Sequence, residues 1–293
     1  MSYSSIKELI DIAKRENKKI GEIARRLESL ESGLSEEELI EEMKKRYNVM
    51  IDAMDRGLKD DTRSLSGLTG GEGKKAWENN KKRLSGENIS KAMARAMAVS
   101  NVNASMGKIV AAPTAGAGGI LPAVVKTISE TNGNTYDEVI DALFTAGAIG
   151  KVIAVRATLS GAEGGCQAEC GAGAAMAAGA AVELSGGSPW QVGNAVAIVL
   201  KSIMGLVCDP IAGLVEVPCI KRNGMYASIA ITAADMALSG IESVIPPDEV
   251  IDAMKEVGDA LPETLKETAL GGLAQTPTAL KITERLKREK GQL

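Results

Sequence analysis

Small side chains at helical spacing constrain the fold of this chain more than any other feature. Only one of its 293 residues is Phe, and aromatic residues make up 2% of the sequence. Alanine and glycine stand where larger residues would be expected, so helix backbones can approach closely and many close contacts replace bulk in the core. Few windows alternate with period two or gather β-branched residues, which argues against a sheet. We therefore expect an all-α fold, a compact Ala/Gly-rich multi-helix domain.

Capping and periodicity divide the chain into an arm and a main domain. The segment Ser5–Glu8 reads as a capping box before an apolar stripe, and 32–58 repeats this pattern with a glycine stop. These two predicted helices form an N-terminal helical arm, residues 1–60, which is part of the same chain fold. The remainder, 61–293, is the main domain and opens with a loop or hinge at 60–75. Further helices are expected at 89–107, 119–131, 136–159, 167–185, 189–206, 225–239, 247–257 and 263–271, with a charged, fraying tail at 281–293.

Charge and hydropathy exclude several classes of function. A net charge of −4 gives no basic surface for nucleic acid, and few aromatic rings are available to stack on bases. The longest uncharged runs, 109–125 and 184–200, are too short to span a membrane and contain Gly and Pro. The N-terminus lacks the charged-then-apolar order of a signal peptide. We expect a cytoplasmic protein that binds neither nucleic acid nor membrane.

Two glycine-rich segments resemble phosphate-binding loops without matching them. SGLTGGEGKK has Leu68 where the Walker spacing requires glycine, and PTAGAGG has Leu121 where a dinucleotide fingerprint requires its third glycine. The second segment still places small residues ahead of a helix, whose free N–H groups would suit a carboxylate. The alternative is a tight turn that simply needs glycine.

Four cysteines lie in one stretch of a chain that has no histidine. Cys166 and Cys170 are in GGCQAECGAG, and Cys208 and Cys219 are in CDPIAGLVEVPC. Thiolates favour zinc, copper(I) or iron–sulfur clusters. The spacing matches neither a zinc knuckle nor a ferredoxin run. The alternative is that these cysteines only fill core, since free cysteine is often buried.

Two cations follow the last cysteine closely. Lys221 and Arg222 could offset the charge of a thiolate cluster or bind an acidic substrate. The alternative is a solvated surface turn, which is common for such a pair.

Four long segments of the chain resemble a known family. NVNASMGKIVAAPTAGAGGILPAVV, EGGCQAECGAGAAMAAGAAVELSGG, GLVCDPIAGLVEVPCIKRN and GGLAQTPTA are similar to the alpha chain of the iron–sulfur-dependent L-serine dehydratases. The resemblance runs from about Ser66 to Thr278 and implies an oxygen-sensitive [4Fe–4S] cluster without pyridoxal phosphate. It makes 61–293 the cluster-binding catalytic domain. One small departure is that PTAGAGG and KRNGM carry glycines where the family commonly has alanine.

The resemblance also implies roles for particular residues. Cys166, Cys208 and Cys219 would hold the cluster, whereas Cys170 matches the motif but is not expected to ligate iron. Three protein thiolates leave one iron open to act as a Lewis acid. L-serine would lose water there, and the resulting aminoacrylate would rearrange and hydrolyse to pyruvate and ammonia. The candidate residues for substrate binding are Ser66, Thr114, Gly116, Arg222 and Asn223.

A base for the α-proton is harder to find, because no histidine is present. The candidates are Lys74, Lys221, a water, or a residue of a partner. The family includes two-chain enzymes with a separate beta chain that carries a Ser/His-rich segment, so a beta-chain partner is implied. Two alternatives stay open: an L-cysteine desulfidase of the same superfamily, or a non-catalytic iron–sulfur protein with Cys170 as fourth ligand.

Overall fold

The computed structural model describes residues 3–61, 63–79 and 84–290, and helices dominate this part of the chain. No strand forms within these ranges. Two isolated β-bridges join Arg63 to Gly70 and Cys208 to Lys266. The all-α expectation is therefore confirmed. The helices are α1 (Ile6–Glu16), α2 (Ile20–Ser32), α3 (Glu36–Lys59), α4 (Glu72–Glu78), α5 (Gly86–Ala104), α6 (Ile120–Asn132), α7 (Tyr136–Arg156), α8 (Gly161–Gly164), α9 (Ala172–Leu184), α10 (Pro189–Ile203), α11 (Cys219–Leu238), α12 (Pro247–Ala260) and α13 (Pro277–Lys290).

Helix α9 is the centre of the molecule. Every one of its residues is buried, and α6, α7, α10 and α11 surround it. Its sequence, AGAAMAAGAAVEL, supplies almost only small side chains. A Cβ at Gly179 would lie 2.2 Å from the Cδ1 atom of Ile149, so any larger residue at this crossing of α7 and α9 would require the Ile149 side chain to move. The small-residue composition thus permits the close helix packing that the sequence predicts.

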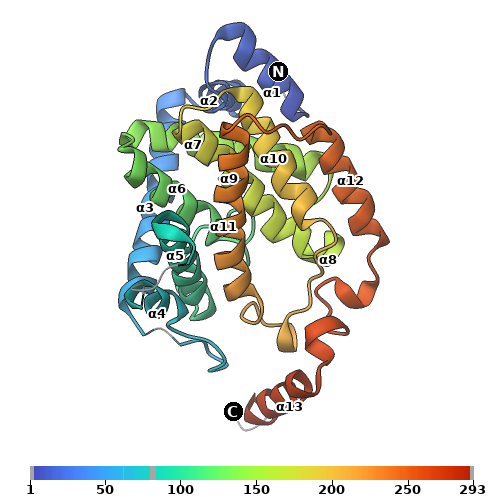
Figure 1. Cartoon of the computed structure of the whole chain (residues 1–293). Coiled ribbons are helices and arrows are strands. Elements are labelled where there is room, and N and C mark those ends of the chain that lie inside the picture. The colour runs from blue at the N-terminus through green and yellow to red at the C-terminus, as the bar shows by residue number, and fades with distance from the viewer. Residues whose placement is uncertain (1–2, 62, 80–83, 291–293) are drawn as a thin grey trace.

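The remaining helices form an outer layer (Figure 1). Helices α3, α4 and α11 pack on α5, α2 packs on α7, and α1 and α12 pack on α10. The two ends of the chain lie at opposite ends of the molecule in Figure 1, with α1 at the top and α13 at the bottom. No helix in the described ranges is long and apolar enough to cross a membrane.

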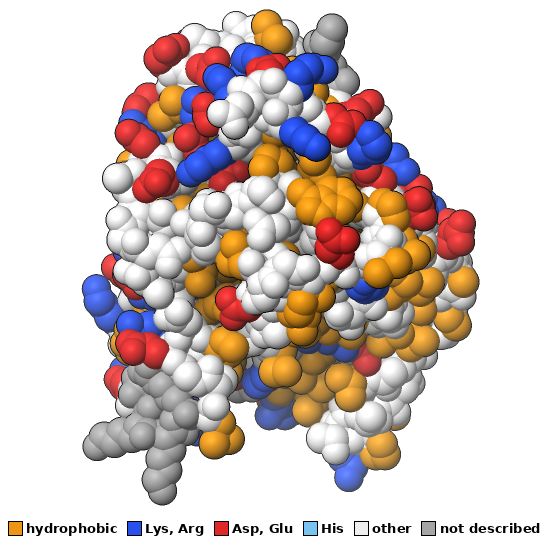
Figure 2. All heavy atoms as spheres, turned by 45° about the horizontal axis from the view of Figure 1, so that its top comes forward, with side chains coloured by type: hydrophobic (Ala, Val, Ile, Leu, Met, Phe, Trp, Pro, Cys, Tyr) orange, Lys and Arg blue, Asp and Glu red, His pale blue; other side chains and the backbone are white. Residues whose placement is uncertain are grey.

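The N-terminal segment contains three helices rather than the two that were predicted. Helix α2 begins after a left-handed turn at Asn17, a break that the capping signals did not reveal. Residues Ile6, Leu9, Ile20 and Ile23 are fully buried in the main hydrophobic core. The end of the molecule that carries α1 and α2 shows positive and negative side chains intermixed on its surface (Figure 2). These helices therefore have a charged outer face and a buried apolar face.

Two local predictions are wrong, and a third, the loop at 60–75, holds for its described residues before Glu72. Segment 263–271 is not a helix: only Glu263–Leu265 forms a 3-10 turn, labelled η4. The tail up to Lys290 forms helix α13, which packs on the 3-10 turns η3 (Ile211–Gly213) and η5 (Gly272–Gln275); residues 291–293 lie outside the described ranges. The expected loop at 60–75 contains the start of the short helix α4. Ala279 is fully buried, so tertiary contacts hold α13 in place.

Candidate active site

Four thiols from three separate segments gather around the π-helical turn η2 (Gln167–Gly171). Cys166 directly precedes this turn and Cys170 lies within it. Cys208 lies in the loop after α10, and Cys219 is the first residue of α11. Cys219 is half-buried and the other three are buried, and all four are free thiols. π-Helical turns are rare and often mark functional sites.

Local backbone geometry explains how Cys166 reaches this place. Gly165 ends the short helix α8 with φ +75°, a left-handed conformation that favours glycine. A Cβ at Gly165 would lie 2.8 Å from the backbone oxygen of Leu206. The backbone N–H of the next turn residue, Gln167, donates to that same oxygen at 3.1 Å. The chain around Cys166 is therefore joined directly to the loop that carries Cys208.

Hydrogen bonds between the thiols shift the pKa values of these thiols in opposite directions. Bonds from the Cys170 and Cys208 thiols hold the pKa of the Cys166 thiol well below its ordinary value. The same bonds raise the pKa of Cys170 and of Cys208, because each of these thiols is needed as a donor. Burial raises the pKa of the Cys219 thiol to about 12. Sulfur atoms in such mutual contact, with Cys166 as the favoured thiolate, form a donor set that suits a soft metal.

The Arg222 guanidinium covers one side of these thiols. It donates to the Val207 carbonyl oxygen at 3.0 Å and to Asp209 Oδ1 at 3.0 Å, and it also hydrogen-bonds to Cys166. Asp209 in turn accepts the backbone N–H of Leu273 at 2.8 Å. Arg222 is thus held by the loop on which Cys208 lies, with its charge directed at the sulfur atoms.

The Glu169 carboxyl group lies on another side of the thiols. Glu169 Oε2 is 4.0 Å from the Cys208 Sγ atom, and Glu169 accepts a hydrogen bond from the Thr114 hydroxyl. Burial is the main cause that raises the pKa of the Glu169 carboxyl to about 7; the hydrogen bond from Thr114 opposes this rise, and the negative charge of Cys166 adds to it. Glu169, Cys208 and Glu267 each offer a possible ligand atom, and these atoms lie within 4.8 Å of one another. A proton or a cation would therefore be favoured at this corner.

The PTAGAGG loop joins the site through Asn223. The fully buried Asn223 side chain donates to the carbonyl oxygens of Gly116 at 2.7 Å and Cys219 at 3.0 Å, and it accepts from the backbone N–H of Gly119 at 3.0 Å. The structure thus brings Thr114, Gly116 and Asn223 together with the thiols. In this structure Asn223 holds the loop against the start of α11.

The two lysines proposed as bases lie in ion pairs. Lys74 Nζ is 3.2 Å from Asp61 Oδ2, and Lys221 Nζ is 2.8 Å from Glu72 Oε1. Both pairs belong to the region around α4. The Ser66 hydroxyl donates to Glu216 Oε2 at 2.8 Å, which ties the loop before α4 to the segment leading into Cys219.

Glu169 is the main site residue that the sequence analysis did not single out. A signal for it exists: it is the one charged residue in the small-residue run from Gly164 to Val182. A carboxylate in a segment that is otherwise buried needs a functional or structural reason, because desolvating a charge is costly. Glu216 also accepts a hydrogen bond from the Thr69 hydroxyl at 2.9 Å. The sequence around Glu216 contains no comparable signal.

Comparison with known proteins identifies the family. The family model described as "Serine dehydratase alpha chain" matches residues 8–274. A Bacillus subtilis chain named "Probable L-serine dehydratase, alpha chain" is 48% identical over 288 residues, which is 97% of this chain and 95% of that protein. The chain belongs to the serine dehydratase alpha chain family.

Two further relatives of this chain differ from each other in length. The "L-serine dehydratase, alpha chain" of Peptoniphilus asaccharolyticus is 42% identical over 98% of this chain and 99% of its own length. The "L-serine dehydratase" of Streptomyces coelicolor is also 42% identical, over 85% of this chain but only 56% of its own length. Relatives of the second kind thus contain a large additional segment outside the match.

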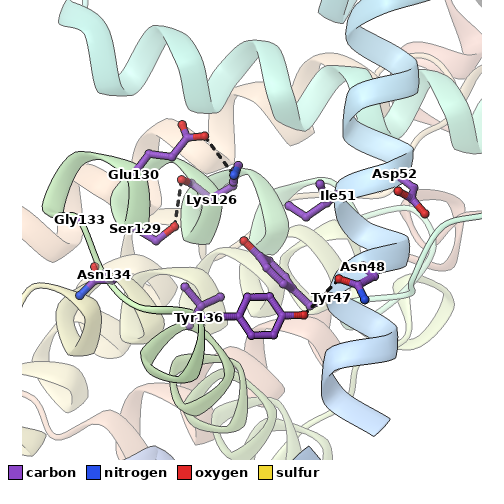
Figure 3. Close-up of a pocket in the computed structure, with 11 residues that line it drawn as sticks. Tyr47, Asn48, Ile51, Asp52, Lys126, Ser129, Glu130, Gly133, Asn134 and Tyr136 are labelled. Carbon is purple, nitrogen blue, oxygen red and sulfur yellow. Dashed lines mark hydrogen bonds and ion pairs between the residues drawn. The ribbon is translucent and has the colours of Figure 1, made fainter. Parts of the chain in front are cut away.

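A pocket of about 500 Å³ lies away from the thiols, between α3, α6 and the start of α7 (Figure 3). Tyr47 and Tyr136 meet there with ring centroids 5.8 Å apart, and Tyr136 donates to Asn48 Oδ1 at 3.1 Å. Its described lining contains no cysteine and none of the predicted site residues. This pocket is therefore separate from the group of thiols.

Proposed function

We propose that this chain is the alpha chain of a two-chain L-serine ammonia-lyase, which dehydrates L-serine to give pyruvate and ammonia. The observation that carries the proposal is the meeting of four cysteines from three segments beside the Arg222 guanidinium. Sulfur donors suit an iron–sulfur cluster, and a buried cation offsets the negative charge that such a cluster carries. The family and the relatives named above supply the substrate class.

We assign a [4Fe–4S] cluster to Cys166, Cys208 and Cys219. Cys170 packs beside Cys166 and is not part of the proposed ligand set. The bound cluster would supply one iron without a protein ligand, a Lewis acid for the departing hydroxyl group. The Arg222 guanidinium would offset the negative charge of the cluster. Asn223 would keep the PTAGAGG loop close to the thiols, where Thr114 and Gly116 face Glu169.

We propose that the base comes from a partner, the beta chain. Lys74 and Lys221 remain the candidates within this chain, but their ammonium groups are engaged in ion pairs with Asp61 and Glu72. The additional segment in the Streptomyces coelicolor relative supports a second component, because this chain covers only 56% of that protein. We also propose a cytoplasmic enzyme, since all four cysteines are free and thiols stay reduced there.

Anaerobic reconstitution tests this proposal. The chain should be loaded with iron and sulfide, with and without a candidate beta chain, and supplied with L-serine or L-cysteine. Pyruvate and ammonia formed from L-serine at a much higher rate than from L-cysteine would support the dehydratase. Sulfide release from L-cysteine as the dominant reaction, or a cluster with no turnover of either amino acid in the presence of the partner, would contradict it.

A further inference from the structure

The Glu169 carboxyl lacks a cationic partner. No Lys or Arg among the described residues forms an ion pair with it, and its hydrogen-bond partners are the Thr114 hydroxyl and the Cys208 thiol. The Cys208 thiol and the Glu267 carboxyl offer atoms within 4.8 Å of it, and neither supplies a positive charge. A half-buried carboxyl without a counter-charge can accept charge-assisted hydrogen bonds from a cationic group of a ligand.

Two glycines provide the space in which this carboxyl lies. A Cβ at Gly161 would lie 2.6 Å from Glu169 Oε2 and 3.3 Å from the Cys208 Sγ atom. A Cβ at Gly116 would lie 3.7 Å from Glu169 Oε1. The carboxyl group therefore lies between the PTAGAGG loop and α8, at the edge of the proposed cluster site. Because the residue is only half-buried, a ligand that enters the site can reach it.

We propose that Glu169 is a specificity-determining residue that binds the α-ammonium group of the amino-acid substrate. This inference rests on the function proposed above. An ammonium group would form a charge-assisted hydrogen bond with the carboxylate and supply its missing cation. A 2-hydroxy acid of the same shape offers a neutral hydroxyl there, so the carboxylate would keep its desolvation cost without a counter-charge. Glu169 thus selects amino acids over hydroxy acids.

The test compares the binding of L-serine and of glycerate, which carries a hydroxyl in place of the amine. Anaerobic calorimetry on cluster-loaded protein should show that the wild type prefers L-serine by at least about 10²-fold. Glu169→Gln should bring the two affinities close together, mainly by weakening L-serine, with iron content unchanged. Glu169→Asp should keep part of the preference because it keeps the charge. The exposed Glu163→Gln, from neighbouring α8, is the matched control and should behave as wild type.

The outcomes separate this inference from the proposed function. If the wild type binds L-serine and Glu169→Gln discriminates as well as the wild type, the role of Glu169 is wrong while the enzyme assignment stands. Loss of iron from Glu169→Gln would place the residue among the groups that hold the cluster and would also overturn the inference. If cluster-loaded wild type binds neither ligand, the proposed function fails and this inference fails with it.

Discussion

Individual residues at the site have distinct electrostatic roles. Cys166 is the thiol whose pKa is lowered, because Cys170 and Cys208 donate to it and Arg222 lies beside it. Cys170 differs from the others, since it lies inside the π-helical turn and donates towards Cys166. The three proposed ligands come from three different segments, so we expect the loss of any one of them to prevent cluster binding.

Serine substitutions test the ligand set. Cys166→Ser, Cys208→Ser and Cys219→Ser should each lose most of the bound iron and the activity, because a hydroxyl is a poor ligand for this soft site. Cys170→Ser should retain both. Iron and sulfide analysis with absorbance spectra after anaerobic reconstitution gives the answer. A Cys170→Ser protein that loses its cluster would contradict the three-ligand assignment.

Sequence patterns reveal the donor residues of this site but not its geometry. The four cysteines and the PTAGAGG loop were recognisable because their residue types carry the chemistry. Glu169 was missed although it is the one charged residue between Gly164 and Val182, and the fold adds that it is half-buried beside Cys208 with no Lys or Arg of the described residues paired to it. The sequence also does not reveal that Lys74 and Lys221 form ion pairs, since Asp61 lies in the loop before α4 and Glu72 at the first position of α4, far along the chain from Lys221.

At the level of elements, α2 docks against α7 and α9 through very close backbone contact. A Cβ at Gly21 would lie 2.1 Å from the backbone oxygen of Asp141, and Glu183 Oε2 accepts the Gly21 N–H at 3.3 Å. The Thr145 hydroxyl donates to the same carboxyl oxygen at 2.7 Å, whereas Glu183 Oε1 has no partner. This junction fixes the N-terminal helices to the core.

Gly21→Ala should destabilise the protein. The new methyl group would meet a backbone oxygen that cannot rotate away, so we expect a loss of roughly 1–3 kcal/mol or more. Gly147→Ala in α7 is the matched control, because no atom lies within 4 Å of its added Cβ. That substitution should be neutral or stabilise the helix by up to about 1 kcal/mol. Equal unfolding midpoints for the two variants in urea would refute the close contact at α2.

Glu183 makes stability depend on pH at the same junction. Burial raises the pKa of its carboxyl to about 7, so the folded protein holds a proton that the unfolded chain loses near pH 4.5. The protonated form favours folding, and this contribution declines as the pH rises from about 4.5 to 7. The loss corresponds to roughly 3 kcal/mol.

Glu183→Gln should therefore flatten the pH profile. The wild-type free energy of unfolding should fall between pH 5 and pH 8, and the variant should fall less, because the amide has no proton to lose. Chemical unfolding at both pH values measures the difference, with the exposed Glu163→Gln as control. Parallel profiles for wild type and Glu183→Gln would show that Glu183 ionises normally in the folded protein.

The sequence predicts the elements with strong periodicity and caps, and misses those that depend on tertiary contacts. The capping boxes at Ser35, Thr135 and Ser188 begin α3, α7 and α10. Helix α13 was missed because its charged sequence is held by contacts with η3 and η5 that only the fold provides. Segment 263–271 was predicted helical, but its chain turns at Glu267 and Ala269, both with positive φ, to bring Glu267 to Cys208.

On the scale of the whole molecule, the described part of the chain brings the proposed cluster ligands and the PTAGAGG loop together, and both lysines considered as bases lie in ion pairs. The loop around Ser66 is tied to the segment before Cys219 through Glu216. A partner that docks near this loop could complete the site. The relatives that contain an additional segment are consistent with such an arrangement.

The isolated chain should bind iron but turn over L-serine slowly. Removal of an α-proton needs a positioned base, which typically contributes about 10²-fold or more. Adding the beta chain should restore at least that factor, measured as pyruvate formed under anaerobic conditions. Full activity from the single chain would remove the need for a partner and direct attention to Lys74 or Lys221.

In the proposed site three thiolates hold a cluster and leave one iron for the substrate. Mössbauer spectroscopy of the chain reconstituted anaerobically with ⁵⁷Fe, recorded before and after L-serine is added, distinguishes that iron from the other three. We expect a four-iron signal in which about a quarter of the iron changes on addition of L-serine, because one iron has no protein ligand. A spectrum in which all the iron stays unchanged, or which shows no iron–sulfur cluster, would rule out the proposed site.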